Sequence, residues 1–349
     1  MIHTVVIGAA GYSGAELVSI LRGHPGARLA GLFGSPRRAG DDAAEAPSIA
    51  DLHPHLRGLV DMPVAPLDLS AIAALKPDVI FLATPHEASL DLAPRCRELG
   101  AVTIDLSGAY RLKDASLYPI HYGFEHTHEN HLETAVYGMP ELFRRQISAA
   151  ELIAAPGCYP TASIIPLAPL LRAGAVERGR RPIIDATSGV SGAGRTPSRK
   201  THFCEVSLQP YNVMAHRHNP EIDAYAGAPV LFTPHLGAYD RGILATIHID
   251  LAEGWSAQRI SDTLHTAYAD DPFVRLLLQG AWPSVAAVRA SNWIDIAFKV
   301  DEEHRHAVLF SAIDNLVKGA AGQAVQCMNL RMNLPETTGL LPGAGASNE

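Results

Sequence analysis

The sequence predicts an α/β protein of about two domains, the first of which is built on a parallel, doubly wound sheet. The chain has 349 residues, 47% of them hydrophobic, and at roughly 150 residues per domain this length suffices for two cores. A glycine-rich turn follows the first apolar segment, and short apolar segments then alternate with helical patterns. This alternation is typical of parallel sheets whose ligands bind at the carboxyl ends of the strands.

The first predicted unit is a strand, a glycine turn and a helix. His3–Ile7 is rich in β-branched residues, and Ala15–Arg22 has apolar residues at helical spacing. Glycines let a backbone approach a pyrophosphate, and a helix N-terminus offers unpaired N–H groups to it. A tight turn without a ligand is the alternative, because the glycines follow G-x-x-G-x-x-G and not G-x-G-x-x-G. The residues expected to bind the cofactor here are Gly8, Ala10, Gly11, Tyr12, Ser13 and Gly14.

The predicted second strand ends in residues that favour NADP over NAD. Ala27–Phe33 predicts a strand, and NAD-binding folds usually place Asp or Glu after it to bind the ribose 2′-hydroxyl. This chain has Ser35, Arg37 and Arg38 there, and a hydroxyl with two guanidinium groups suits a 2′-phosphate. The alternative is a solvated basic turn.

Further strand–helix units continue the pattern. Asp78–Ala83 predicts a strand followed by a helix over residues 89–99, and Val102–Leu106 predicts the next strand. The segment after that strand, Ser107–Arg111, is therefore expected at the ligand-binding edge of the sheet.

One of the four cysteines is placed where a reactive thiol would be. Cys158 lies in Pro156–Thr161, between a predicted strand over Leu152–Ala155 and an apolar, helix-like segment. The N–H dipoles at a helix N-terminus favour the thiolate, which is the nucleophilic form of cysteine. The alternative, a buried apolar cysteine, is the expectation for the other three, Cys96, Cys204 and Cys327.

The segment His216–Ile222 (HRHNPEI) is a second candidate site. Asn219 followed by Pro220 predicts an N-cap and first position of a helix. If the chain before it is extended, His216 and His218 project to one side, where one imidazole could serve Cys158 as acid or base. A metal-binding pair and two surface histidines are the alternatives, and no third ligand at convincing spacing supports a metal.

A Gly/Ser-rich loop, Ser188–Arg195, follows a strand predicted over Pro182–Ala186. Backbone N–H groups of such a loop can hold an anion or close over a cofactor, although a flexible loop is equally compatible. Ser188 and Gly189 are candidates for cofactor contacts, and Arg195 is a candidate for the substrate.

Composition excludes several classes of protein. A net charge of −8 argues against nucleic-acid binding, which usually depends on a basic surface. The longest uncharged segment, Leu152–Leu171, contains four prolines and is a poor membrane span. The N-terminus does not resemble a signal peptide, and four dispersed cysteines favour a reducing cytoplasm over a disulfide framework.

Taken together, these motifs resemble a known family. Similarity runs in order from residue 2 to about residue 340, and HRHNPEI and SGVSGAGR distinguish the family from the related aspartate-semialdehyde dehydrogenases. The family resembled is N-acetyl-gamma-glutamyl-phosphate reductase. The motifs that carry the resemblance are GAAGYSGAEL, DLSGAYRL, APGCYPT, SGVSGAGR, THFCEV, HRHNPEI, TPHL, RGILATI and DNLVKGAAGQAVQ.

The resemblance implies a fold and an assembly. A Rossmann NADP-binding domain over residues 1–157 would be completed by a C-terminal helix within 314–349. A second α/β (α+β) domain over 158–313 would carry the substrate contacts and the subunit interface. A homodimer or homotetramer is implied.

The resemblance also implies residue roles. Cys158 matches the nucleophile and His218 the acid/base, while Arg111, His216 and Arg195 are expected to contact the substrate or its phosphate. Asn315 lies where relatives contact the nicotinamide. Ala155 departs from the Asn common before Pro-Gly-Cys, which puts one hydrogen bond of the turn in doubt.

The implied reaction is NADPH-dependent reduction of the acyl phosphate N-acetyl-L-glutamyl 5-phosphate to the semialdehyde, through a thioester on Cys158. A reductase of lysine biosynthesis is the alternative enzyme, but an excess of acidic residues disfavours the basic docking face that it would need. A NADP-binding redox sensor lacks a resolving thiol at close spacing. A Cys/His hydrolase leaves the glycine turn without a purpose.

Overall fold

The computed structural model describes residues 1–36 and 46–341. Arg37 and Arg38, two of the predicted cofactor contacts, lie outside the described residues. The chain divides into two compact units, of which one comprises Met1–Pro156 with the chain from Ala320 onward, and the other Gly157–Gly319. The sequence predicts boundaries at 157/158 and 313/314, whereas residue 157 and residues 314–319 lie in the second unit.

The first unit is built on a seven-stranded parallel sheet of order β3-β2-β1-β4-β5-β7-β6. This is the doubly wound order of nucleotide-binding folds, with β1 at the point where the order reverses, and it confirms the predicted fold class. The strands are β1 (Ile2–Ile7), β2 (Ala27–Phe33), β3 (Val64–Ala65), β4 (Val79–Leu82), β5 (Val102–Asp105), β6 (Val136–Tyr137) and β7 (Leu152–Ala154). The helices are α1 (Tyr12–Leu21), α2 (Ile49–Leu52), α3 (Leu69–Ala74), α4 (His86–Glu98), α5 (Leu117–His121), α6 (Glu129–Thr134), α7 (Pro140–Ile147) and α12 (Gly322–Arg331), with a 3₁₀ turn at Pro54–Leu56.

Alternating side chains give this sheet a core on each face. In β1, Val6 packs into a cluster with residues of α1 and α12, whereas Val5 and Ile7 pack with α3 and α4. Both faces are apolar because helices cover both, as expected for a parallel sheet. Helix α12 therefore returns from the end of the chain to pack on the first unit.

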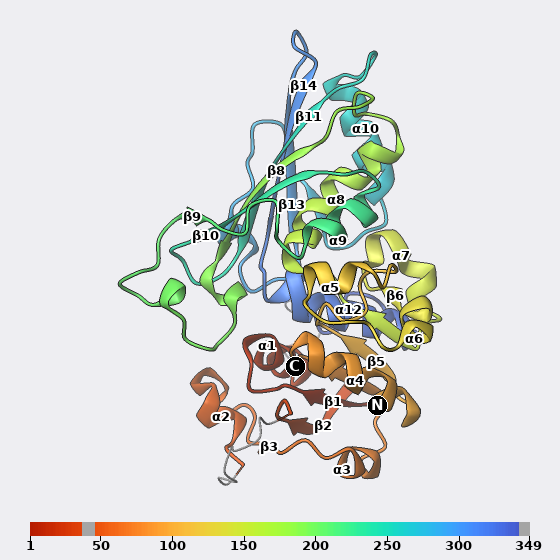
Figure 1. The fold of residues 1–349 in the computed structure, drawn as a ribbon, viewed down its shortest axis with the longest axis vertical. Helices are drawn as coiled ribbons and strands as arrows, with labels where there is room; N and C mark the ends of the chain where they lie inside the picture. Colours follow the sequence, from red (N-terminus) through yellow and green to blue (C-terminus); the bar gives the residue numbers. More distant parts are fainter. Residues whose placement is uncertain (37–45, 342–349) are drawn as a thin grey trace, which may run out of the picture. The chain divides into compact units, whose positions relative to one another are not determined.

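The second unit contains a mixed seven-stranded sheet of order β12-β13-β14-β11-β8-β10-β9. Helices α8 and α10 pack on one face of it, and α9 packs along α8 (Figure 1). The strands are β8 (Ile183–Gly189), β9 (Gln209–Pro210), β10 (Leu231–Gly237), β11 (Ile243–Asp250), β12 (Val274–Leu276), β13 (Ile294–Asp301) and β14 (His306–Ile313). The helices are α8 (Cys158–Arg172), α9 (Asn219–Ala226), α10 (Ala257–Tyr268) and α11 (Val285–Val288), with 3₁₀ turns at Val190–Ala193 and Arg199–Thr201 and a π-helical turn at Val317–Ala321.

Helix α8 is buried along almost its whole length although it contains Pro166 and Pro169. A proline inside a helix lacks the N–H that would bond to the carbonyl four residues earlier. Here Ser311 Oγ donates to the carbonyl of Ala162 at 2.5 Å, and the Tyr268 hydroxyl donates to that of Ile165. The two carbonyls that the prolines leave open therefore accept side-chain hydroxyls.

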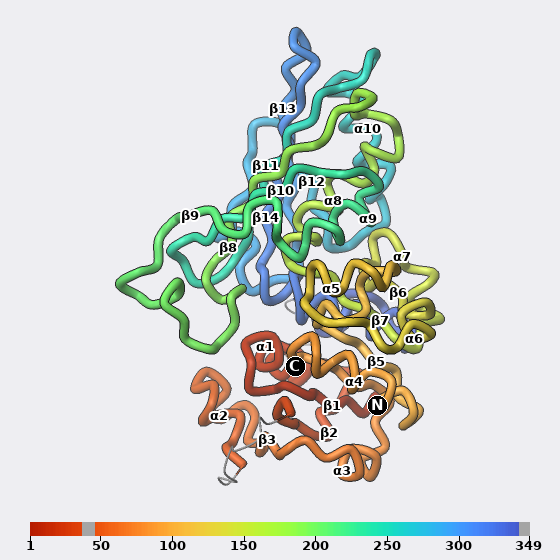
Figure 2. The backbone as a smooth tube through the Cα atoms, in the orientation of Figure 1, coloured from red at the N-terminus to blue at the C-terminus, as the bar shows by residue number. Residues whose placement is uncertain are grey.

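Helix α4 uses the same device. Pro94 lies inside this helix, and the Tyr110 hydroxyl donates to the carbonyl of Leu90 at 2.6 Å. Within the described residues, no helix is both long enough and apolar enough to cross a membrane. The uncharged segment noted in the sequence is instead β7 followed by α8, as the path of the backbone shows (Figure 2).

Candidate functional site

The glycine turn between β1 and α1 is tightly packed. A Cβ at Gly8, where φ is +88°, would lie 2.3 Å from the carbonyl oxygen of Ala83, and a Cβ at Gly14 would lie 2.3 Å from that of Gly8. Neither position can carry a side chain without moving the backbone of β4 or of the turn itself. The ring of His53 bonds through Nε2 to the carbonyl of Ala10 at 3.0 Å and holds the turn from the outside.

The start of α1 fits an anion. Gly11 is its N-cap, no side chain caps it, and its first turn holds no acidic residue. Helix N-termini without such partners bind phosphate groups through backbone N–H groups and the helix dipole. Tyr12 and Ser13 are at least partly exposed there, which suits a pyrophosphate of a dinucleotide.

The residues that the structure describes directly after β2, 34–36, include no carboxylate that could bind a ribose. Gly34 bonds through its N–H to the carbonyl of Ala65 at 2.9 Å, and the half-buried Ser35 follows. Since Arg37 and Arg38 lie outside the described residues, their part in reading a 2′-phosphate stays a prediction.

Cys158 begins helix α8 as the sequence predicts. Gly157 is the N-cap, with an extended backbone and no side chain in the capping position, and the thiol is partly exposed. An uncapped helix N-terminus favours negative charge at this position. The other cysteines differ, since Cys96 and Cys327 are buried, whereas Cys204 is exposed and so departs from the expectation for it.

A buried carboxylate, whose role is not predicted from the sequence, connects the two candidate motifs through a hydrogen bond. Glu221, fully buried in the first turn of α9, accepts a hydrogen bond from the Gly157 N–H at 2.8 Å. Residue 157 directly precedes Cys158, and His218 is the N-cap of α9. The bond therefore joins the N-termini of α8 and α9, which run side by side (Figure 1).

His216 and His218 lie together, with ring centroids 4.7 Å apart, and each is 6% exposed. Arg217 between them is exposed, so the predicted grouping of the histidines is correct, although the backbone forms a turn and is not extended. The predicted N-cap is off by one residue. Because Asn219 N–H already bonds to the His216 carbonyl, His218 is the cap and Asn219 begins the helix.

The surroundings of His216 fix its protonation state. Nδ1 of His216 accepts the His218 backbone N–H at 3.1 Å, so its neutral ring carries the proton on Nε2. Burial, together with the nearby Arg217, lowers the pKa of His216 to about 4. At neutral pH His216 is a fixed neutral ring, which leaves His218 as the better candidate for proton transfer.

Two tyrosines complete the surroundings of the thiol, and neither was singled out from the sequence. Tyr211 donates to the Tyr159 hydroxyl at 3.1 Å, and Tyr159 donates to the His235 carbonyl at 2.9 Å. Burial raises the pKa of both, that of Tyr211 to about 12. Both tyrosines therefore stay protonated at neutral pH. Tyr159 also packs edge-on against His216 and His218 and so holds their rings.

The segment that contains Asn315 contacts the same region of the second unit. A Cβ at Gly319 would lie 2.7 Å from the Cβ of Cys158, so this glycine backs the thiol. Asn315 is 2% exposed and accepts a hydrogen bond from Gly242 N–H at 2.6 Å. Ser188 and Gly189, the other predicted cofactor contacts of this unit, are buried at the end of β8.

The two predicted phosphate-binding arginines are placed differently. Arg111 is 4% exposed and donates through Nε to Ala155 and through Nη2 to Leu106, both carbonyls at 2.8 Å. It thus braces the ends of β5 and β7 just before the Pro-Gly-Cys turn. Arg195 is exposed, after the 3₁₀ turn Val190–Ala193 and the left-handed Gly194.

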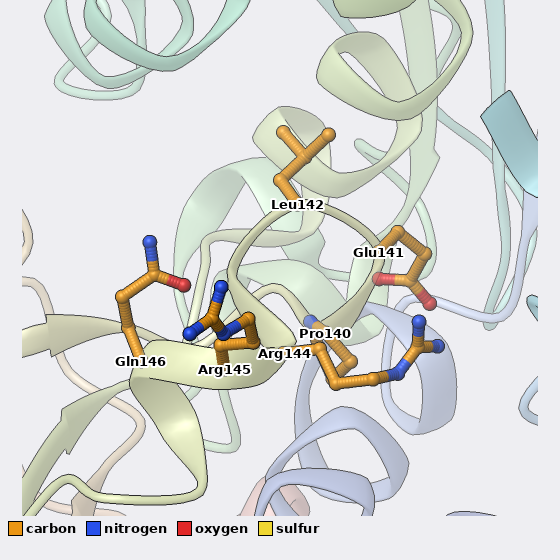
Figure 3. Close-up of a pocket in the computed structure, with 6 residues that line it drawn as sticks. All are labelled: Pro140, Glu141, Leu142, Arg144, Arg145 and Gln146. Carbon is orange, nitrogen blue, oxygen red and sulfur yellow. The ribbon is translucent and has the colours of Figure 1, made fainter.

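A hollow of about 610 Å³ lies along α7 of the first unit (Figure 3). Arg144, one of its lining residues, pairs with Glu336 at 2.7 Å. None of the predicted site residues lines this hollow. The lining residues are Pro140, Glu141, Leu142, Arg144, Arg145 and Gln146.

In the described part of the chain, no three His, Cys, Asp or Glu side chains gather as metal ligands.

Comparison with known proteins assigns the chain to a family. Residues 3–150 match the family described as semialdehyde dehydrogenase, NAD binding domain, and residues 158–315 match semialdehyde dehydrogenase, dimerisation domain. An N-acetyl-gamma-glutamyl-phosphate reductase of Yersinia pseudotuberculosis (serotype I, strain IP32953) is 50% identical over 341 residues, which cover 98% of this chain and 100% of the relative. The chain belongs to the N-acetyl-gamma-glutamyl-phosphate reductase family.

A second member of the reductase family, from Escherichia coli K12, is 47% identical over 343 residues, again covering 98% of this chain and 100% of the relative. Solved structures show the same fold at lower identity. Aspartate semialdehyde dehydrogenase II of Vibrio cholerae superimposes with a TM-score of 0.68 at 18% identity, covering 95% of this chain and 99% of that one. The resemblance found in the sequence is thereby confirmed.

Proposed function

We propose that this protein catalyses the NADPH-dependent reduction of N-acetyl-L-glutamyl 5-phosphate to N-acetyl-L-glutamate 5-semialdehyde and phosphate, a step of arginine biosynthesis. The observation that carries the proposal is the bond between Glu221 and Gly157, which joins the thiol-bearing helix to the histidine-bearing helix. It occurs in a chain 50% identical to a reductase of that name.

The residues supply a thiol nucleophile and a proton donor. The Cys158 thiolate forms a bond to the γ-acyl carbon, and phosphate leaves with the electron pair of the broken C–O bond, which gives a thioester. His218 would give a proton to the oxygen of the reduced, tetrahedral intermediate on Cys158 and take it back as the C=O bond of the semialdehyde re-forms, while His216 and Tyr159 pack against its ring. Release of the semialdehyde returns the electron pair to sulfur and restores the thiolate.

The cofactor site of the first unit fits a dinucleotide. The uncapped start of α1 would hold the pyrophosphate, and Ser35 with Arg37 and Arg38 would bind the 2′-phosphate. When bound, NADPH supplies the hydride that reduces the thioester carbonyl. Asn315, Ser188 and Gly189 are proposed to contact the nicotinamide end, and Arg111 and Arg195, with His216 nearby, the substrate.

The proposed assembly is a homodimer or homotetramer, for which the match to a dimerisation domain is the support. We place the enzyme in the cytoplasm, where a reducing environment keeps a thiol nucleophile such as Cys158 in its reduced form.

The reverse reaction tests the proposal. Protein, NADP⁺, phosphate and N-acetylglutamate semialdehyde should yield reduced cofactor only when phosphate is present, and aspartate semialdehyde should give none.

Cys158→Ala should abolish turnover while NADPH binding is kept, and Cys204→Ala, which removes an exposed thiol, should change nothing. Activity in Cys158→Ala would contradict the covalent scheme, and activity only with another aldehyde would change the substrate.

A further inference from the structure

The segment Asp314–Gly319 carries two contacts of the proposed active site. Near its start, Asn315 accepts from Gly242 N–H at 2.6 Å and donates through Nδ2 to Ser191 Oγ at 3.0 Å. At its end, Gly319 lies against the Cβ of Cys158. The conformation of these few residues therefore sets both an expected nicotinamide contact and one wall of the thiol site.

A buried ion pair fixes the first residue of this segment. The Asp314 carboxylate is fully buried and meets Arg241 side-on, with Oδ2 2.8 Å from Nε and Oδ1 2.9 Å from Nη2. Arg241 directly precedes Gly242, whose N–H binds Asn315. The guanidinium of Arg241 thus holds the side chain of Asp314, and the N–H of Gly242 holds the next side chain, Asn315.

The same carboxylate also holds the backbone. Its oxygens accept the N–H groups of Leu316 at 2.9 Å, Val317 at 3.2 Å and Ala290 at 2.6 Å. The Asp314 carbonyl accepts the N–H of Gly319 at 2.9 Å, which closes the π-helical turn. The side chain and the backbone carbonyl of Asp314 together therefore shape the path from Asn315 to the residue behind the thiol.

A buried ion pair contributes little net stability compared with apolar residues of similar size, while its directional bonds fix geometry. We propose that Arg241 and Asp314 are positioning residues, which hold Asn315 and Gly319 so that the nicotinamide and the thioester are aligned for hydride transfer. This inference rests on the proposed function and extends it to two residues that contact neither the cofactor nor the thiol.

The test uses full-length protein with the double variant R241Q/D314N, which removes both charges but leaves polar side chains at both positions, and the single variant R241K. We expect R241Q/D314N to lower kcat at least about 10-fold, with the KM for the acyl phosphate within about threefold. The isotope effect with 4-deuterated NADPH should rise, because misalignment slows hydride transfer more than thioester formation. R241K keeps the charge but not the side-on geometry, so its kcat should lie between those of the wild type and R241Q/D314N.

Hydrogen exchange gives a readout that does not depend on turnover. Amides over 316–319 should exchange faster in R241Q/D314N without any cofactor, since a neutral amide oxygen accepts more weakly from Leu316 and Val317 than the carboxylate does, and the turn that closes at Gly319 loosens with them. The matched control is the exposed pair one residue earlier, Asp240 with Arg289, whose Oδ1 and Nη1 lie 2.7 Å apart. D240N/R289Q should leave kcat within about twofold and the exchange over 316–319 unchanged.

A purely structural pair would lower the thermal midpoint of R241Q/D314N while kcat and the isotope effect, measured well below that midpoint, stayed at wild-type values. That result overturns the inference, as does unchanged exchange over 316–319. If the wild type itself reduces no acyl phosphate, the proposed function fails and the inference with it. An active wild type with an equally active R241Q/D314N overturns the inference alone.

Discussion

At the scale of single residues, the site separates two histidines that the sequence presents as equivalent. His216 is fixed as a neutral ring by the backbone N–H of His218, by burial and by Arg217. His218 caps α9, whose first turn bonds to the residue before the thiol. Only the structure reveals this difference, because it arises from contacts and not from spacing.

Replacement of each histidine should show the division of roles. His218→Asn should lower kcat by about 10²–10⁴-fold, the usual contribution of a positioned acid or base. His216→Asn should cost less, because its neutral ring transfers no proton at neutral pH. Steady-state kinetics of the two variants decide the matter, and a larger loss in His216→Asn would reverse the assignment.

The lowered pKa of His216 predicts a loss of stability in acid. The unfolded chain binds a proton at this group near its ordinary pKa of 6.5, whereas the folded protein does so only at about 4. Between these values unfolding takes up a proton, so the free energy of unfolding falls as the pH drops through this window and is constant above it.

At about pH 5 this single group should cost about 2 kcal/mol relative to about pH 7. Urea unfolding of His216→Asn at both values should show a pH dependence smaller by about that amount. His265→Asn, which changes an exposed histidine of α10, should keep the wild-type dependence. An unaltered pH dependence in His216→Asn would contradict the assigned protonation.

At the scale of elements, strands whose signal is local could be predicted from the sequence. The segment 27–33 is β2 as predicted, and β4, β5 and β7 differ from their predictions by one or two residues. Helix α1 begins at Tyr12, before the predicted Ala15, because the glycine turn itself enters the helix. In the second unit the sequence predicts only one strand, over Pro182–Ala186, since the pairing of its mixed sheet depends on distant segments.

Long-range polar pairs could not be predicted, and they define the site. Glu221 lies in the motif HRHNPEI, but its partner is a backbone N–H 64 positions away. Arg241 and Asp314 are separated by 73 positions. Glu, Arg and Asp side chains usually lie at the protein surface, and sequence patterns do not show which of them are buried.

The prolines of α8 give a prediction about this element. Ser311→Ala would leave the carbonyl of Ala162 buried without a donor, at a cost of about 1–3 kcal/mol in the free energy of unfolding. In a Pro166→Ala background the cost should be smaller, because residue 166 then donates its own N–H to that carbonyl.

A double-mutant cycle by urea unfolding measures this coupling. Thr263→Ala is the control, since its hydroxyl donates to a carbonyl of an exposed helix surface in α10 and should cost less than about 0.5 kcal/mol. Strictly additive effects of Ser311→Ala and Pro166→Ala would show that the hydroxyl does not replace the missing N–H.

At the scale of the whole molecule, one face of the second unit's sheet is not covered by its own helices. Outward side chains of its central strands β8 and β11 are mixed: Ile183 is 43% and Leu244 37% exposed, and polar residues such as Thr187 and Thr246 alternate with them. Trp282 packs edge-on against Phe310 of the neighbouring strand β14. Strand positions that alternate with these are buried against α8 and α10. A sheet face that its own unit leaves open, with exposed apolar side chains among polar ones, suits the subunit interface expected of a dimerisation domain.

A charge on this face should therefore dissociate the assembly. Leu244→Asp, at the centre of the open face, should lower the mass measured by sedimentation equilibrium towards that of one chain, 37.2 kDa. Gln258→Asp, on the exposed side of α10, should leave it unchanged. A mass unaffected by Leu244→Asp would place the interface elsewhere.

The construction of α8 has a consequence for how the second unit acquires its structure. With prolines at positions 160, 166 and 169, this segment has little tendency to form a helix alone. The hydroxyls that complete it are 149 and 103 positions away along the chain. Its helicity must therefore appear late, after distant chain segments have met, and the nucleophile at its first residue is presented only once that slow, non-local step is complete.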